Sequence, residues 1–315
     1  MSKHYDDMSR RGFLSWSAAA SVGLAFSGLA GSSLAANYAQ RKVSVFSKHL
    51  QWLDYEPMAE LAAEIGFDGV DLSVRPRGHV LPERVQQDLP RAIKAVHDAG
   101  LNVDMITTAI TDPDDPLTEK VLSTASRFGI ANYRMGFLDY DEKAGVARTL
   151  EDLKPRMAAL ARLNEKYNIH GAYQNHTGTR IGGAIWDIWE LVKNLNPQWI
   201  GCQYDIRHAV AEGGTSWPVR MKLLLPHIKS MVIKDFFWGQ EAGKWRIINC
   251  PVGEGMVDFP AYFEILNQAR FDGPFSMHFE YDMPGEELEL TRRKQATVSL
   301  MKKDLKVLRS YLAQG

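Results

Sequence analysis

One unit recurs along the chain after residue 41: a short apolar strand, a polar loop, and an amphipathic helix that ends near Gly or Asn. We count eight such units, with strands expected at Val43–Phe46, Gly69–Val74, Asn102–Thr107, Asn132–Gly136, His170–Asn175, Ile200–Asp205, Ser230–Lys234 and Pro274–Glu280. Helices are expected in the gaps. Alternating strands and helices imply a parallel sheet, and eight repeats in about 270 residues fit a closed barrel better than an open sheet. We therefore predict an α/β fold, a (β/α)₈ TIM barrel, over residues 41–315.

Composition excludes several other classes of protein. Lys and Arg total 37 and Asp and Glu total 38, and no basic block lies outside the N-terminus, so nucleic acid is not an expected partner. No Gly-x-Gly-x-x-Gly follows the first strand, and we expect no nucleotide cofactor. The two cysteines, Cys202 and Cys250, are too few for a disulfide framework. We interpret them as packing residues, with a single bridge as the alternative in an oxidising compartment.

The N-terminal segment has the pattern of an export signal. Arg10 and Arg11 precede an apolar run of small residues from Trp16 to Ala30, and Ser33-Leu34-Ala35 offers a small-x-small cleavage site. We predict a twin-arginine signal peptide over residues 1–36, a periplasmic or otherwise exported mature protein, and no stable membrane span after cleavage. A soluble N-terminal helix and an uncleaved membrane anchor are the alternatives.

Ionisable and polar residues gather where the expected strands end. The carboxyl ends of the strands form the active-site face of a TIM barrel. After strands one to four these residues are Lys48, His49, Arg75, Arg77, His79, Thr107, Thr108, Arg134 and Tyr140. After strands five to eight they are Gln174, Asn175, His176, Thr177, Asp205, Arg207, His208, Lys234, Asp235, His278 and Glu280. Any one of them could instead cap a helix or clamp a loop.

Their convergence on one face suggests a catalytic site. Because side chains in a strand alternate with a period of two, Gln203 and Asp205 share one face of the sixth strand, and His278 and Glu280 share one face of the eighth. Both acidic groups can therefore point into one mouth. We predict catalytic roles for Glu280, His208, Lys234 and Asp205, and substrate-binding roles for Gln174, His176, Arg75, Arg134, His278 and Trp238. Arg75 and Arg77, together with Arg134, would suit an anionic or heavily hydroxylated ligand.

Several motifs carry a resemblance to a known family. They are Gly66-Phe67-Asp68-Gly69-Val70-Asp71-Leu72, Asp205-x-x-His208, Lys234-Asp235, Pro251-Val252-Gly253-Glu254-Gly255 with Asp258-Phe259, and Glu280. In this order and spacing the chain resembles the xylose isomerase-like TIM barrel superfamily, the sugar phosphate isomerase/epimerase family, across nearly all of residues 41–315. The superfamily includes ketose epimerases, hydroxypyruvate isomerases and inosose dehydratases. The resemblance implies a small-molecule carbohydrate as partner, and an oligomer is compatible with it.

The resemblance also implies a divalent metal, held by Glu, Asp, His and Glu from strands five to eight. Asp205 and Glu280 fit this set, whereas Gln174 and Val232 stand at the other two positions. If a metal is bound, Asp205, Glu280 and Gln174 are its expected ligands, although an amide is a poorer ligand than a carboxylate for a hard dication. In the epimerases of this family the two glutamates act as opposed acid and base, and Gln174 removes one of them.

Three functions remain open from the sequence. The first is a sugar or keto-sugar isomerase or epimerase, in which Glu280 removes a proton α to a carbonyl and either His208 or His176 returns it. Lys234 or Arg134 would stabilise the enediolate oxygen, and Lys234 could replace the charge of a metal. The second is a keto-sugar lyase or dehydratase, which needs only one base and one acid. The third is a non-catalytic barrel in which Trp52 and Trp238 stack on sugar rings.

Overall fold

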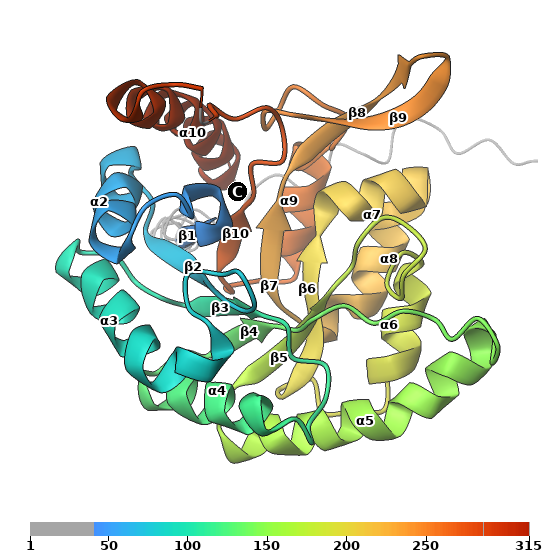
Figure 1. Cartoon of the computed structure of the whole chain (residues 1–315). Helices are drawn as coiled ribbons and strands as arrows, with labels where there is room; N and C mark the ends of the chain where they lie inside the picture. The colour runs from blue at the N-terminus through green and yellow to red at the C-terminus, as the bar shows by residue number, and fades with distance from the viewer. Residues whose placement is uncertain (1–40, 286, 315) are drawn as a thin grey trace, which may run out of the picture.

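Eight parallel strands close into a barrel in the computed structural model, which describes residues 41–285 and 287–314. The strands are β1 (Val43–Phe46), β2 (Gly69–Val74), β3 (Met105–Thr108), β4 (Asn132–Arg134), β5 (His170–Gln174), β6 (Ile200–Asp205), β7 (Ile228–Ile233) and β10 (Phe275–Met277). They follow one another around the barrel in chain order, and β10 closes it against β1 (Figure 1). The predicted (β/α)₈ barrel is confirmed. The predicted signal peptide lies outside the described residues and stays a prediction.

Helices surround the barrel on its outside (Figure 1). They are α2 (Tyr55–Ile65), α3 (Val85–Asp98), α4 (Pro116–Arg127), α5 (Val146–Lys166), α6 (Ile185–Val192), α7 (Ile206–Gly213), α8 (Trp217–Leu224), α9 (Phe259–Gln268) and α10 (Leu290–Leu312). Short 3-10 turns lie at Ser47–Leu50, Pro82–Arg84, Gly214–Ser216 and Leu225–His227. Within the described residues, no helix has the length and hydropathy needed to cross a membrane.

The interval between β7 and β10 differs from the prediction. In addition to α9 it contains an antiparallel hairpin of β8 (Asp235–Glu241) and β9 (Lys244–Cys250), which projects beyond the ring of helices (Figure 1). Its two-residue turn, Ala242-Gly243, has positive φ at both positions, 49° and 75°. This is the geometry of a tight turn that matches the twist of two antiparallel strands. A helical interpretation of the whole interval was therefore wrong.

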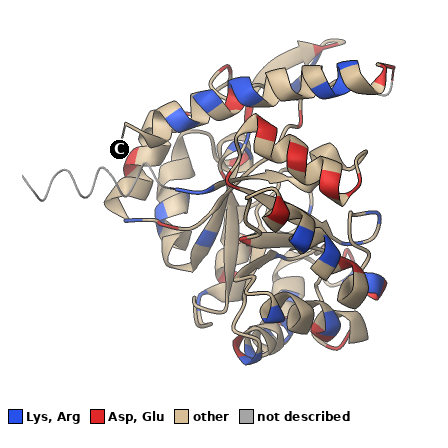
Figure 2. Cartoon of the chain, turned by 90° about the vertical axis from the view of Figure 1, so that its left-hand side faces the viewer, with Lys and Arg blue, Asp and Glu red and all other residues tan. Residues whose placement is uncertain are grey.

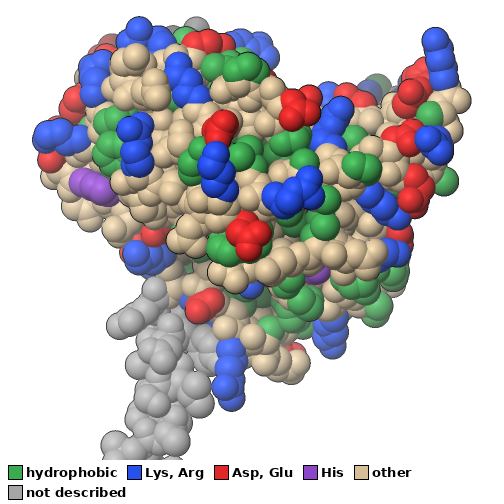
Figure 3. All heavy atoms as spheres, turned by 90° about the horizontal axis from the view of Figure 1, so that it is seen from below, with side chains coloured by type: hydrophobic (Ala, Val, Ile, Leu, Met, Phe, Trp, Pro, Cys, Tyr) green, Lys and Arg blue, Asp and Glu red, His purple; other side chains and the backbone are tan. Residues whose placement is uncertain are grey.

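The surface carries both signs of charge. Basic and acidic residues both occur on the outer helices (Figure 2) and are interspersed on the face seen in Figure 3. The last helix, α10, begins at Leu290, where the Glu289 carboxylate accepts hydrogen bonds from the backbone N–H groups of residues 291 and 292. Leu305 and Leu308 of α10 are buried, whereas Lys302 and Lys303 are exposed.

Polar groups inside the barrel connect strands that are distant in sequence. The buried carboxylate of Asp71 on β2 accepts hydrogen bonds from Thr107 on β3, at 3.0 Å, and from Ser276 on β10, at 2.8 Å. Gly201 of β6 lies so close to the turn before β7 that a Cβ at this position would be 1.9 Å from the carbonyl oxygen of His227. Only glycine fits there. Cys202 and Cys250 are both buried free thiols.

Asp235, at the start of β8, organises the glycine-containing loop that leads to α9. Its carboxylate accepts hydrogen bonds from the backbone N–H groups of Phe236, Gly253, Gly255 and Val257 at distances of 2.8 to 3.2 Å. Burial raises the pKa of Asp235, against the effect of these four donors. The Asp of the Lys-Asp pair is therefore a structural residue that holds the loop against the end of β7.

Replacing Asp235 by Ala should lower the free energy of unfolding by about 3 kcal/mol or more, because several buried N–H groups lose a charged acceptor at once. Asp258→Ala is the matched control. Asp258 caps α9 through a single bond to Ala261, and losing such a cap costs about 1 kcal/mol. Urea unfolding of both variants measures the difference. Equal losses in the two variants would contradict the role of Asp235.

Candidate active site

The mouth of the barrel is centred on one fully buried carboxylate. Asp205 ends β6 and has no exposed surface. Its Oδ2 accepts a hydrogen bond from Nε2 of Gln174, at 2.8 Å, and lies 2.9 Å from Nζ of Lys234. Its Oδ1 accepts a bond from the backbone N–H of His208, at 3.2 Å. The structure thus brings four of the predicted site residues together, from the ends of β5, β6 and β7.

The orientation of Gln174 follows from its other neighbour, Arg134. Nη1 of Arg134 donates to Oε1 of Gln174 at 2.9 Å. Because a guanidinium can only donate, the amide oxygen must face Arg134 and the amide nitrogen must face Asp205. Gln174 is 2% exposed and cannot turn freely in this position. At the point where a glutamate would present an oxygen, this chain presents N–H donors.

His208 is held in its neutral form. Burial, followed by the ammonium of Lys234, lowers the pKa of His208 well below its usual range. Nζ of Lys234 lies 2.8 Å from its Nε2, and Nη1 of Arg207 lies 2.8 Å from its Nδ1. The backbone N–H of Thr177 also points at Nδ1, at 3.2 Å. Since an N–H group and a guanidinium only donate, Nδ1 is the acceptor atom of this ring.

Two asparagines position the mouth, and the sequence analysis assigned neither a role. Oδ1 of Asn175 accepts from the backbone N–H of Asp205 and its Nδ2 donates to the carbonyl of Asp205, at 2.8 and 2.9 Å. Asn249 lies on β9, where it accepts from Arg207 and donates to the carbonyl oxygen of Glu280, at 3.1 Å. Asn175 follows Gln174, a predicted substrate-binding residue, in the sequence. Asn249 lies on the hairpin of β8 and β9, which was not predicted.

Glu280 lies on the other side of the mouth, three residues beyond the end of β10. Its side chain is 31% exposed, and its Oε2 lies 3.5 Å from Nζ of Lys48. Burial alone would raise the pKa of Glu280, but Lys234 and Lys48 outweigh that effect and lower it. Glu280 is therefore an ionised and accessible carboxylate at neutral pH.

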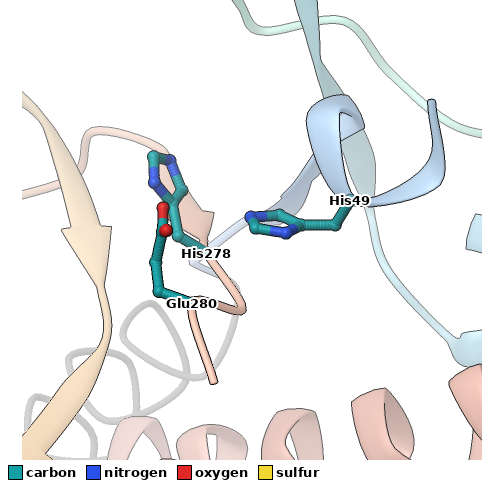
Figure 4. Close-up of side chains that lie close together, drawn as sticks. All are labelled: His49, His278 and Glu280. Carbon is teal, nitrogen blue, oxygen red and sulfur yellow. The ribbon is translucent and has the colours of Figure 1, made fainter. Parts of the chain in front are cut away.

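His49 and His278 complete this side of the mouth. Figure 4 shows His49 reaching toward His278 and Glu280 from the turn after β1. Ligand-type atoms of these three residues lie within 4.8 Å of one another. Burial lowers the pKa of His49 to about 3 and that of His278 well below its usual range, so both rings are neutral. Nε2 of His49 accepts the backbone N–H of Phe279 at 3.1 Å.

The remaining predicted residues divide into two groups. His176 stacks near His208, with ring centroids 4.0 Å apart, and Arg75 lies over the ring of Phe46. Both belong to the mouth. Trp238 lies on β8 in the projecting hairpin and is 42% exposed. Trp52 is covered by the guanidinium of Arg293 from α10, 4.4 Å from the ring centroid, so its indole packs against a helix.

A scan against protein-family models matches residues 59–311 to the xylose isomerase-like TIM barrel model, which covers most of the chain. The chain belongs to the xylose isomerase-like TIM barrel family. A comparison with curated protein sequences found no match.

Solved structures share the fold of this family member at low identity. A xylose isomerase-like TIM barrel protein from Mycobacterium smegmatis, in complex with magnesium, aligns with a TM-score of 0.65 and 13% identity, over 88% of this chain and 98% of that one. A D-allulose 3-epimerase from Methylomonas sp., in complex with D-allulose, aligns with a TM-score of 0.60 and 15% identity, over 86% of this chain and 97% of that one. A probable 3-DHS dehydratase from Bacillus anthracis aligns with a TM-score of 0.62 and 17% identity, over 85% of this chain and 98% of that one.

The residues present do not fit the metal that the family implies. Val232 is fully buried and has no ligand atom, Gln174 turns its nitrogen toward the site, and the ammonium of Lys234 already neutralises Asp205. The cluster around Glu280 is also compromised, because Lys48 lies beside the carboxylate and His49 already uses the lone pair of Nε2. No chemical step is therefore assigned to a metal.

Chelation should leave this protein unchanged. Wild-type protein treated with EDTA, and then supplied with Mg²⁺ or Mn²⁺, is expected to keep its melting temperature within about 1 °C, because a ligand that does not bind gives no stabilisation. The variant Gln174→Glu/Val232→His/Lys234→Met supplies two ligands and removes the competing ammonium. Its melting temperature should therefore rise when Mg²⁺ or Mn²⁺ is added. Stoichiometric metal in the purified wild type, or a fall in its melting temperature on chelation, would contradict this.

Asp71→Asn should remove a pH-dependent loss of stability. Burial raises the pKa of Asp71 to about 6, whereas an unfolded aspartate titrates near about 3.9, so the folded state favours the protonated form. This stabilisation is complete below about pH 4 and is lost as the pH rises through about 6, a change of about 3 kcal/mol. In urea unfolding between pH 4 and 7.5, the free energy of unfolding of the variant should increase relative to that of the wild type as the pH rises. A difference between the two that does not change with pH would refute the effect.

Proposed function

We propose that this chain is an isomerase or epimerase of a sugar or keto-sugar, which acts by removing a proton α to a carbonyl at the mouth of the barrel. The observation that carries the proposal is the presence, at one mouth, of an ionised and accessible carboxylate, Glu280, and a buried ammonium, Lys234. A base and a fixed positive charge are the two groups that formation of an enediolate requires. The sugar epimerases with this fold are consistent with it.

Each step of the proposed reaction has a residue suited to it. Glu280 takes the proton, because Lys234 and Lys48 keep its pKa low and its charge in place. The ammonium of Lys234, held by Asp205 at 2.9 Å, faces the negative charge that develops on the carbonyl oxygen. Because that ammonium is preorganised by a buried partner, little rearrangement is needed when charge develops.

His176 is better placed than His208 to act on the opposite side of the substrate: its Nε2 takes up a proton from solvent and passes it to the enediolate, while Glu280 releases to solvent the proton that it removed. Nδ1 of His176 lies 2.8 Å from the carbonyl oxygen of Thr177, which can only accept, so Nδ1 carries the proton and Nε2 offers a lone pair. Burial lowers the pKa of His176, so the ring is neutral. In His208 the acceptor nitrogen, Nδ1, is already engaged with Arg207 and with the backbone N–H of Thr177. His176 follows β5 and Glu280 follows β10, so a substrate between them would meet a base from each side.

Elimination is the second candidate, and the state of Gln174 favours it. With Arg134 and Asp205 bound to its amide, Gln174 has no proton to exchange, and the mouth keeps one accessible carboxylate where paired glutamates would give two. A lyase or dehydratase needs one base and one acid to expel a β-substituent. The Arg10-Arg11 segment adds the proposal that either reaction takes place outside the cytoplasm.

Incubation with a panel of ketohexoses and 3-ketoglucosides in D₂O, followed by NMR, tests both candidates. Deuterium at a retained carbon supports isomerisation or epimerisation, whereas an unsaturated ketone supports elimination. Glu280→Gln should slow the reaction by about 10²–10⁴-fold, and Lys234→Met by about 10²–10³-fold. Glu254→Gln is the matched control, since it removes a carboxylate from an exposed ion pair with Lys303 and should leave the rate unchanged. Exchange that persists in Glu280→Gln would refute the assigned base.

A further inference from the structure

Two arginines lie against one aromatic ring in the mouth. The guanidinium carbon of Arg75, after β2, is 5.4 Å from the ring centroid of Phe46, and that of Arg134, on β4, is 5.8 Å from it. Burial and the charge of Arg75 lower the pKa of Arg134 to about 10, so both groups stay charged at neutral pH. Two like charges thus share one side of the site.

Neither guanidinium is in direct contact with a carboxylate of the described residues. Within residues 41–285 and 287–314, no carboxylate lies within 4.0 Å of either guanidinium. Arg134 is 6% exposed, and among the described residues only its Nη1 has a hydrogen-bond partner, while its buried Nε has none. The guanidinium of Arg75 makes no hydrogen bond to a described residue. A buried cation in a folded protein is normally paired, because desolvation without a partner is costly.

His278 adds a third polar group to the same place. Its ring stacks on Phe46, with centroids 4.6 Å apart and an angle of 28° between the planes. The side chain is 5% exposed, and its Nε2 is buried without a hydrogen-bond partner among the described residues. The two guanidiniums and this imidazole therefore place polar nitrogens that lack a partner around one aromatic ring.

The nearby carboxylates are engaged elsewhere. Asp71 accepts from Thr107 and Ser276, Asp205 is bound to Lys234, and Glu280 is closest to Lys48. Asp71 and Glu280 therefore act on the arginine pair only from beyond ion-pair distance in the part of the mouth that the structure describes. An anionic group of a ligand would give the two guanidiniums the direct partner that they lack.

We infer that Phe46, Arg75, Arg134 and His278 form a subsite for an anionic group of the substrate, a phosphate or a carboxylate. This rests on the proposed function, and it narrows the substrate from keto-sugars in general to keto-sugar acids or keto-sugar phosphates. Guanidinium groups suit both anions because their planar donors pair with two oxygens at once. Phe46 forms the apolar base on which these donors are arranged.

Calorimetric titration of the mature protein with D-fructose, D-fructose 6-phosphate, 2-keto-D-gluconate and inorganic phosphate tests the subsite. At least one anionic sugar should bind ten times or more tightly than D-fructose, and which one does so identifies phosphate or carboxylate as the group. Arg75→Gln should weaken that binding by about tenfold, the equivalent of one charge-assisted hydrogen bond. Arg77→Gln is the matched control: it removes the same charge two residues away, from a side chain exposed on the loop.

Arg134→Lys is the second variant, because it keeps the buried charge and removes the planar donors. It should also weaken binding of the anionic sugar. Equal binding of neutral and anionic sugars, equal effects of Arg75→Gln and Arg77→Gln, or no binding of any anionic probe at about 10 mM would overturn the subsite. Failure of the proposed function is a separate result. Arg75-dependent binding without proton exchange in D₂O keeps the subsite and rejects the reaction, whereas exchange on D-fructose that Arg75→Gln leaves unaltered does the reverse.

Discussion

The buried ion pair between Asp205 and Lys234 is the interaction on which the mouth of this barrel depends. It joins β6 to the end of β7, and Gln174 extends it to β5 and, through Arg134, to β4. Removing one partner from such a pair leaves an uncompensated buried charge, which typically costs about 3–5 kcal/mol. Four neighbouring strand ends therefore form one electrostatic unit.

The departures from the family pattern leave less negative charge to balance at the mouth. Gln174 is neutral where the family has a glutamate, and Val232 is apolar where it has a histidine. Lys234 therefore has one buried carboxylate, Asp205, as its partner. Had Gln174 remained a glutamate, the ammonium alone would have faced two buried carboxylates in contact with each other, a costly arrangement. Val232 has no polar group that needs a partner, and it is therefore compatible with a site in which Asp205 pairs with Lys234 and no metal is held.

The sequence predicted the barrel well because its strands are continuous apolar runs between polar loops. β1, β2 and β6 have the predicted bounds, whereas β10 covers only Phe275–Met277 of the predicted range Pro274–Glu280. The composition of the site could be predicted from residues at strand ends. The hydrogen-bond partners within the site could not be predicted. The bond from Arg134 to Gln174 spans 40 residues, and the bond from Asn249 to Glu280 depends on an unpredicted hairpin. Spacing along one strand contains no information on partners from another.

The hairpin of β8 and β9 gives this barrel a region that can change in length without disturbing the rest. Its first and last residues, Asp235 and Cys250, pair with each other, so the chain leaves and re-enters the barrel at one point. Because side chains in a strand alternate with a period of two, adding two residues to each strand would extend the tip and keep every side chain on its present face. Asn249 would stay at the mouth. Variation in the reach of the hairpin is thus separable from variation in the chemistry at its base.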